Sequence, residues 1–139
     1  MIQVKLLSEN AVMPTKTHVN DAGWDLYSSV GGEILSGYRK LLPTGVAMAI
    51  PAGYYGRIAD RSGNAYRSGV HVLAGVIDSS YVGELKVLLV NLSGETFEFK
   101  QGDRVAQLVI TPICTMPLIS VSDLDETSRG SSGFGSSGK

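Results

Sequence analysis

Residues 70–91 read VHVLAGVIDSSYVGELKVLLVN. Two runs in this stretch, residues 70–73 and 85–91, are rich in β-branched and aliphatic side chains, which favour extended strands. Gly75 and Gly83 interrupt the segment between the two runs, and glycines beside polar residues are typical of turns. We therefore expect two short β-strands, separated by a hairpin around residues 74–77 and a polar turn.

The same alternation of short strand-like runs and glycines extends over most of the chain. Seventeen of the 139 residues are glycine, and such punctuation is typical of all-β domains. The expected strands are residues 3–7, 24–28, 40–42, 46–50, 55–59, 70–73, 85–91, 96–99 and 105–113. A helical pattern is expected only near residues 64–67, for one or two turns. The sequence thus predicts an all-β fold, a distorted jelly roll or β-barrel with at most one short helix.

Composition limits the possible partners. A chain of 139 residues fits one domain, and a formal net charge of −1 provides no basic field for nucleic acid. The single cysteine, Cys114, excludes an intrachain disulfide and a multi-cysteine zinc site. Because it follows the apolar run 108–113, we expect Cys114 to be a small buried hydrophobic residue.

The chain begins directly with a strand pattern at residues 3–7 and lacks the charged and apolar regions of a signal peptide. No apolar run approaches the roughly 18 residues that a membrane span needs. We therefore expect a soluble cytoplasmic protein that has no membrane association.

The composition changes after about Asp123, and residues 128–139 are almost entirely glycine and serine. Residues 133–138 match a dinucleotide-binding fingerprint, and residues 133–139 match the start of a Walker A loop. Both motifs require a following helix, which the chain does not provide. The interpretation that remains is a β domain over residues 1–123 and a flexible arm over 124–139. Such an arm would close over a polyphosphate as a lid.

Five segments carry recognisable motifs in one order: AGWDLYS at 22–28, DRSGNA at 60–65, GVIDSSYVGEL at 75–85, GDRVAQL at 102–108 and RGSSGFGS at 129–136. Together they resemble the trimeric dUTP pyrophosphatases (dUTPases), over nearly the whole chain. The resemblance implies a jelly-roll homotrimer with active sites between subunits. It also implies conversion of dUTP to dUMP and pyrophosphate with Mg²⁺, which limits uracil in DNA and supplies dUMP for thymidylate synthesis.

The resemblance assigns Asp78 as the carboxylate that activates the attacking water. From its neighbours alone, Asp78 would be interpreted as a turn-former bonding its own backbone. Tyr81 resembles the aromatic residue that packs on the deoxyribose, and main-chain groups around Gly75, Val76 and Ile77 would read uracil. A fixed donor–acceptor pair there would be left unpaired by cytosine, which discriminates strongly.

The remaining assignments concern phosphates and metal. Residues expected to bind substrate are Arg61, Ser62, Gly63, Lys86, Gln107, Arg129, Phe134, Gly135 and Ser136. Among them, Gln107 resembles the amide at the α-phosphate, Arg129 the cation at the γ-phosphate, and Phe134 the ring over uracil. Asp25 would hold Mg²⁺ through a water molecule, because Mg²⁺ keeps several waters and needs few protein ligands.

Arg104 is expected to form a structural ion pair with Asp103 or another acid, and His18 and His71 to be structural or surface residues. Two departures from the family pattern affect phosphate binding. Asp60 replaces a proline, so its charge would oppose phosphate unless it turns away. Asn64 replaces a leucine and suggests different packing or an extra polar contact.

Two alternatives remain. A dCTP deaminase shares the expected fold, but deamination needs an acid–base residue at the base, and residues 72–77 contain no glutamate. A dUTPase-like module could instead use the nucleotide as a switch for a regulatory protein partner. The complete set of five motifs favours the hydrolase without excluding that second role.

Overall fold

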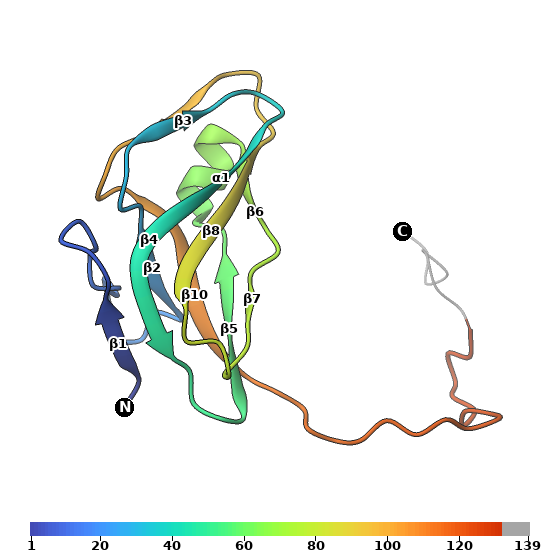
Figure 1. Ribbon diagram of the computed structural model, residues 1–139. Helices are drawn as coiled ribbons and strands as arrows, with labels where there is room; N and C mark the ends of the chain where they lie inside the picture. Colours follow the sequence, from blue (N-terminus) through green and yellow to red (C-terminus); the bar gives the residue numbers. More distant parts are fainter. Residues whose placement is uncertain (132–139) are drawn as a thin grey trace.

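The computed structural model describes residues 1–131 as a set of antiparallel strands with one short helix (Figure 1). The elements in chain order are β1 Gln3–Leu6, β2 Gly23–Tyr27, β3 Gly32–Ile34, β4 Arg39–Ala49, β5 Tyr54–Ala59, α1 Ser62–Ser68, β6 Val70–Leu73, β7 Val76–Ile77, β8 Glu84–Asn91, β9 Phe97–Phe99 and β10 Arg104–Pro112.

The strands form three sheets. The first has the order β1-β4-β8-β6, the second β2-β10-β5-β7, and β3 pairs with β9. All pairings between these strands are antiparallel. The predicted all-β class with one short helix is therefore confirmed, as facing sheets and not as a closed barrel among the described residues.

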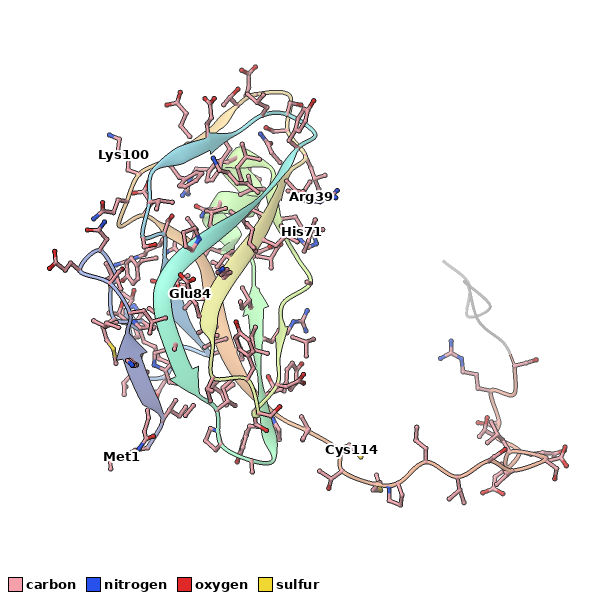
Figure 2. The ribbon with its side chains drawn as sticks, in the orientation of Figure 1. Met1, Arg39, His71, Glu84, Lys100 and Cys114 are labelled. Carbon is pink, nitrogen blue, oxygen red and sulfur yellow. The ribbon has the colours of Figure 1, made fainter. Side chains whose placement is uncertain are left out.

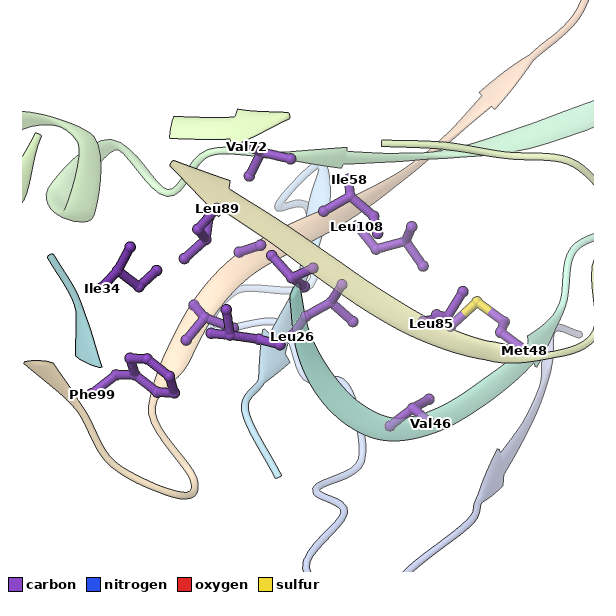
Figure 3. Close-up of a cluster of buried hydrophobic side chains, with 14 of the residues drawn as sticks. Leu26, Ile34, Val46, Met48, Ile58, Val72, Leu85, Leu89, Phe99 and Leu108 are labelled. Carbon is purple, nitrogen blue, oxygen red and sulfur yellow. The ribbon is translucent and has the colours of Figure 1, made fainter. Parts of the chain in front are cut away.

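The core lies between the two four-stranded sheets (Figure 3). Strand β8 shows how the sequence produces it, because Leu85, Val87 and Leu89 alternate with more exposed residues and are at most 1% exposed. They meet Leu26 of β2 and Leu108 of β10 from the second sheet. Burial of one such aliphatic side chain contributes about 1.5–3 kcal/mol.

Strand β4 differs from the prediction. The expected strands 40–42 and 46–50 are one strand, and its register against β8 shifts between Pro43 and Val46. Proline cannot donate to a ladder, so it sits at this bulge. The Thr44 hydroxyl donates to the Leu85 carbonyl (2.6 Å) and bridges the irregularity. Strands β3 and β7 are too short for a pattern and are additional to those predicted.

The C-terminal part leaves the sheets where β10 ends at Pro112. Residues 112–131 are all exposed, and the segment runs away from the body of the molecule (Figure 1). Cys114 lies on this segment and is exposed (Figure 2), so the prediction of a buried cysteine is wrong. The apolar run before it belongs to β10, but its direction after Pro112 carries Cys114 out of the core. Over residues 1–131, none of the helical structure has the length and apolarity required to cross a bilayer.

Candidate functional site

One cavity brings together residues from three of the five motifs. It has a volume of about 460 Å³ and lies beside α1, between β2 and the end of β5. Its lining includes five residues that the sequence singled out, namely Asp25, Arg61, Ser62, Gly63 and Gln107. We call it the arginine cavity, because Arg61 and Arg67 both line it.

Asp25 anchors the charge of the arginine cavity. Its Oδ1 accepts a hydrogen bond from Arg61 Nε at 2.8 Å, and its Oδ2 lies 3.3 Å from Arg104 Nε. The predicted ion pair of Arg104 therefore exists, with Asp25 as its partner. Because Arg61 uses its Nε here, both of its terminal amino groups remain as donors for a ligand. The Asp25 side chain is only 14% exposed, which strengthens these pairs relative to surface ones.

Gln107 is held in the cavity by two contacts. Its Nε2 donates to the main-chain carbonyl of Asp60 at 2.7 Å. Its side chain also lies directly over Gly23, where an added Cβ would stand 2.3 Å from Gln107 Oε1. The glycine of the first motif is thus needed to leave room for the glutamine of the fourth.

The Asp60 side chain points away from the arginine cavity. Its Oδ2 lies 2.7 Å from His71 Nδ1, and its Oδ1 accepts the Val72 N–H at 2.6 Å. The second departure is also explained, because Asn64 donates from Nδ2 to the Arg104 carbonyl at 2.9 Å. Asp60 therefore ties the second motif to β6, and Asn64 ties it to β10.

The second group of predicted residues lines a smaller pocket of about 240 Å³ between β7 and β8. We call it the Asp78 pocket. It is lined by Val76, Ile77, Asp78, Tyr81, Glu84 and Lys86. Tyr81 is fixed at the rim because its hydroxyl donates to the Glu84 carbonyl at 2.8 Å, and the Lys86 ammonium lies 3.6 Å from Glu84 Oε2.

Main-chain conformation shapes the edge of the Asp78 pocket. Ala74 and Gly75 both have positive φ, at 61° and 101°. The Gly75 carbonyl accepts the Ile58 N–H at 2.8 Å, and a Cβ at Gly75 would lie 2.6 Å from the Ile58 carbonyl oxygen. A left-handed alanine is strained by roughly 1–2 kcal/mol. The packing and hydrogen bond of this turn against β5 must offset that strain, because the turn keeps this conformation.

Within one chain the two cavities are separate. Among residues 1–131, no residue lines both. In Figure 1, α1 lies toward the upper end of the molecule and the loop from β7 to β8 lies at the lower end. Arg129 belongs to the exposed segment of residues 112–131, which runs away from the body of the molecule (Figure 1). The predicted residues Phe134, Gly135 and Ser136 are outside the described residues.

Three residues of the arginine cavity lie outside the five motifs and were not predicted from the sequence: Thr17, Asp21 and Arg67. Thr17 and Asp21 lie in the loop before β2, which carries no regular pattern. Arg67 had a usable signal, because it lies six residues after Arg61 on the short helix that begins within the second motif.

A family model described as dUTPase matches residues 9–138 of the chain. The deoxyuridine 5'-triphosphate nucleotidohydrolase of Arabidopsis thaliana is 48% identical over 136 residues, which cover 98% of this chain and 82% of the relative. The enzyme of the same name from Nautilia profundicola is 45% identical, over 99% of both chains.

Solved dUTPase structures are similar to this chain as well. A mutant dUTPase of Staphylococcus bacteriophage 80alpha with dUpNHpp superposes with a TM-score of 0.95, at 32% identity over 100% of this chain and 99% of that one. A mutant dUTPase from phage phi11 of S. aureus, described with a structural Mg(II) ion, gives a TM-score of 0.83 at 33% identity, over 88% of this chain and 97% of that one. The chain described here therefore belongs to the dUTPase family.

Proposed function

We propose that this chain is a dUTP diphosphatase, which hydrolyses dUTP to dUMP and pyrophosphate at sites shared between the subunits of a homotrimer. The observation that supports a site shared between subunits is that the two cavities are separate within one chain. Each holds a coherent part of the site, since the arginine cavity has anion donors and the Asp78 pocket has the carboxylate. A site that joins the arginine cavity of one chain to the Asp78 pocket of another uses both.

In the Asp78 pocket, main-chain groups of Gly75, Val76 and Ile77 read the base. The positive φ angles at residues 74 and 75, together with the hydrogen bond from Ile58, hold these groups in one orientation. Uracil presents an N3–H donor beside an O4 acceptor, whereas cytosine presents the reverse. A fixed backbone pair therefore leaves cytosine with buried unpaired groups, which costs affinity. Tyr81 packs on the deoxyribose and excludes a 2′-hydroxyl, and Lys86 adds a cation at the rim.

In the arginine cavity, the chain binds the phosphates. Arg61 donates from its two terminal amino groups, and its bond to Asp25 fixes the plane of the guanidinium. Ser62 supplies a hydroxyl, and Gly63 allows close approach of the main chain. Gln107 donates at the α-phosphate side from the position set by Gly23 and Asp60. These donors are in place before substrate binds, which lowers the cost of organising the transition state.

The residues present fit a magnesium ion held through water. Residues 1–131 contain no cluster of three metal-binding side chains. Asp25 Oδ1 already accepts a hydrogen bond from Arg61, and its Oδ2 forms an ion pair with Arg104. A carboxylate oxygen has a second lone pair, so each can still accept from a metal-bound water. When bound, Mg²⁺ would supply positive charge to the triphosphate and to the pyrophosphate leaving group.

Asp78 acts as the general base. Its carboxylate takes a proton from a water as the water oxygen bonds to the α-phosphorus. The bond from that phosphorus to the oxygen bridging to the β-phosphate breaks, and pyrophosphate departs with both electrons of that bond. The arm of residues 124–139 closes the site, with Arg129 on the γ-phosphate, Phe134 over uracil and Gly135 and Ser136 at the phosphates. We place this activity in the cytoplasm, which suits a chain with a single cysteine.

The test is a substrate panel. Full-length protein is incubated with Mg²⁺ and dUTP, UTP, dTTP or dCTP, and both pyrophosphate and ammonia are measured. Pyrophosphate from dUTP alone is the expected result. Ammonia from dCTP would identify a deaminase, and an absence of any turnover would leave a binding module.

A further inference from the structure

Arg67 is the second arginine of the arginine cavity. It lies in the last turn of α1, and its guanidinium lies over the main chain of Gly63. An added Cβ at Gly63 would stand 2.7 Å from Arg67 Nη2 and 3.2 Å from its Cζ. The glycine therefore leaves room for the Arg67 guanidinium, and Arg67 lines the same cavity as Arg61 and Ser62.

Arg67 differs from Arg61 in that it has no carboxylate partner among residues 1–131. Asp25 is shared between Arg61 and Arg104, and Asp21 Oδ2 accepts the main-chain N–H of His18 at 2.8 Å. Within residues 1–131, no carboxylate lies within ion-pair distance of Arg67. Among these residues Arg67 thus carries a positive charge that no ion pair neutralises, on a planar group suited to bidentate phosphate binding.

We propose that Arg67 is a further substrate-binding residue that contacts the β- and γ-phosphates of dUTP, which become the pyrophosphate product; this rests on the proposed function. The assignment follows from the walls of the cavity. Gln107, at the α-phosphate side, lies over Gly23 on β2, whereas Arg67 lies over Gly63 on α1. With the α-phosphate at Gln107 on the β2 wall, the distal phosphates are assigned to Arg67 on the α1 wall of the same cavity.

The test compares two nucleotides that differ only in those phosphates. Binding of the non-hydrolysable imido analogue of dUTP and of dUMP, both with Mg²⁺, is measured by calorimetry on full-length protein. In Arg67→Gln, the Kd of the analogue should rise roughly 10- to 100-fold, as expected for loss of a charged hydrogen bond. The Kd of dUMP should change by no more than about twofold.

Two variants serve as controls. Arg67→Lys keeps the charge but loses the planar fork, so it should recover part of the analogue affinity. Arg39→Gln removes an exposed arginine of β4 that does not line the cavity (Figure 2), and it should bind both nucleotides like the wild type. Thermal melting checks that each variant folds, and Arg67→Lys still gives a result if Arg67→Gln does not.

Two outcomes overturn the inference. Equal weakening of analogue and dUMP would mean that Arg67 only shapes the cavity, and unchanged analogue binding would mean that it contributes nothing. Wild-type turnover of dUTP, assayed separately, tests the proposed function itself. Intact wild-type turnover combined with unaltered analogue binding in Arg67→Gln would reject the role of Arg67 while the proposed function stands.

Discussion

The arginine cavity and the Asp78 pocket are built in different ways. Side chains from distant parts of the chain make the arginine cavity, as in the pair of Asp25 with Arg61 and the bond from Gln107 to Asp60. The Asp78 pocket is largely local, made by residues 76–86 and shaped by main-chain angles at Ala74 and Gly75. On the proposed function, phosphate recognition would depend on a network of side chains, whereas base recognition would depend on backbone geometry. Substitutions should affect the two cavities differently.

The largest effect is expected at Asp78. Asp78→Asn keeps the shape of the pocket but removes the base, so turnover of dUTP should fall roughly 10²- to 10⁴-fold. The Kd of the imido analogue should stay close to the wild-type value, as measured by calorimetry. If binding and turnover fell together, Asp78 would be a structural residue of the turn and the proposed division of roles would be wrong.

Removal of the arm should have the next largest effect. A chain that ends at Ser128 lacks Arg129 and the residues after it. Its turnover should fall roughly 100-fold or more, because the charged donor at the γ-phosphate and the closing arm are lost together. Its melting temperature and oligomeric state, measured by light scattering, should not change, since residues 112–131 are exposed. Wild-type rates in the truncated chain would exclude a lid.

Gly75→Ala tests the backbone-determined pocket. The new Cβ would meet the Ile58 carbonyl at 2.6 Å, in a residue with φ of 101°, and neither main chain can easily move. The matched control is Gly53→Ala, which has φ of 84° and open space around the new Cβ. Gly53→Ala should cost about 1–2 kcal/mol of stability from φ alone. Gly75→Ala should lower the free energy of unfolding, measured by urea denaturation, by roughly 1–3 kcal/mol more than Gly53→Ala does. An equal loss of stability in the two variants would show that the turn at Gly75 can adapt to the new Cβ.

Gly23→Ala tests the cavity determined by side chains and should have the smallest effect. The new Cβ would meet only the flexible end of Gln107, at 2.3 Å from its Oε1, so the amide moves and the fold persists. The KM for dUTP should rise about 10-fold, because one hydrogen bond to a charged group is lost. Gly94→Ala, with nothing within 4 Å of its Cβ, is the control. A KM unchanged from the wild type would show that Gln107 is not at the phosphates.

Much of the fold could be predicted from the sequence, because β-strand patterns are local. The alternation in residues 85–91 is confirmed as β8, with Leu85, Val87 and Leu89 in the core. The sequence predicted two strands on either side of Pro43, whereas the structure has the single strand β4 with a bulge there. The sequence could not show this, because the continuity of β4 depends on its pairing with β8. Cys114 was placed in the core for a similar reason. Its neighbours in sequence are apolar, but the chain leaves the sheet at Pro112.

The sequence by itself determined the all-β class and, through five motifs in order, the dUTPase family, because both depend on residue types at fixed separations along the chain. Only the tertiary structure decided how those motifs meet. It paired Asp25 with two arginines, turned Asp60 toward His71 and left Arg67 without a carboxylate partner among residues 1–131. These outcomes depend on contacts between residues up to about eighty positions apart, whose distances in space are set by strand pairing and not by local preference.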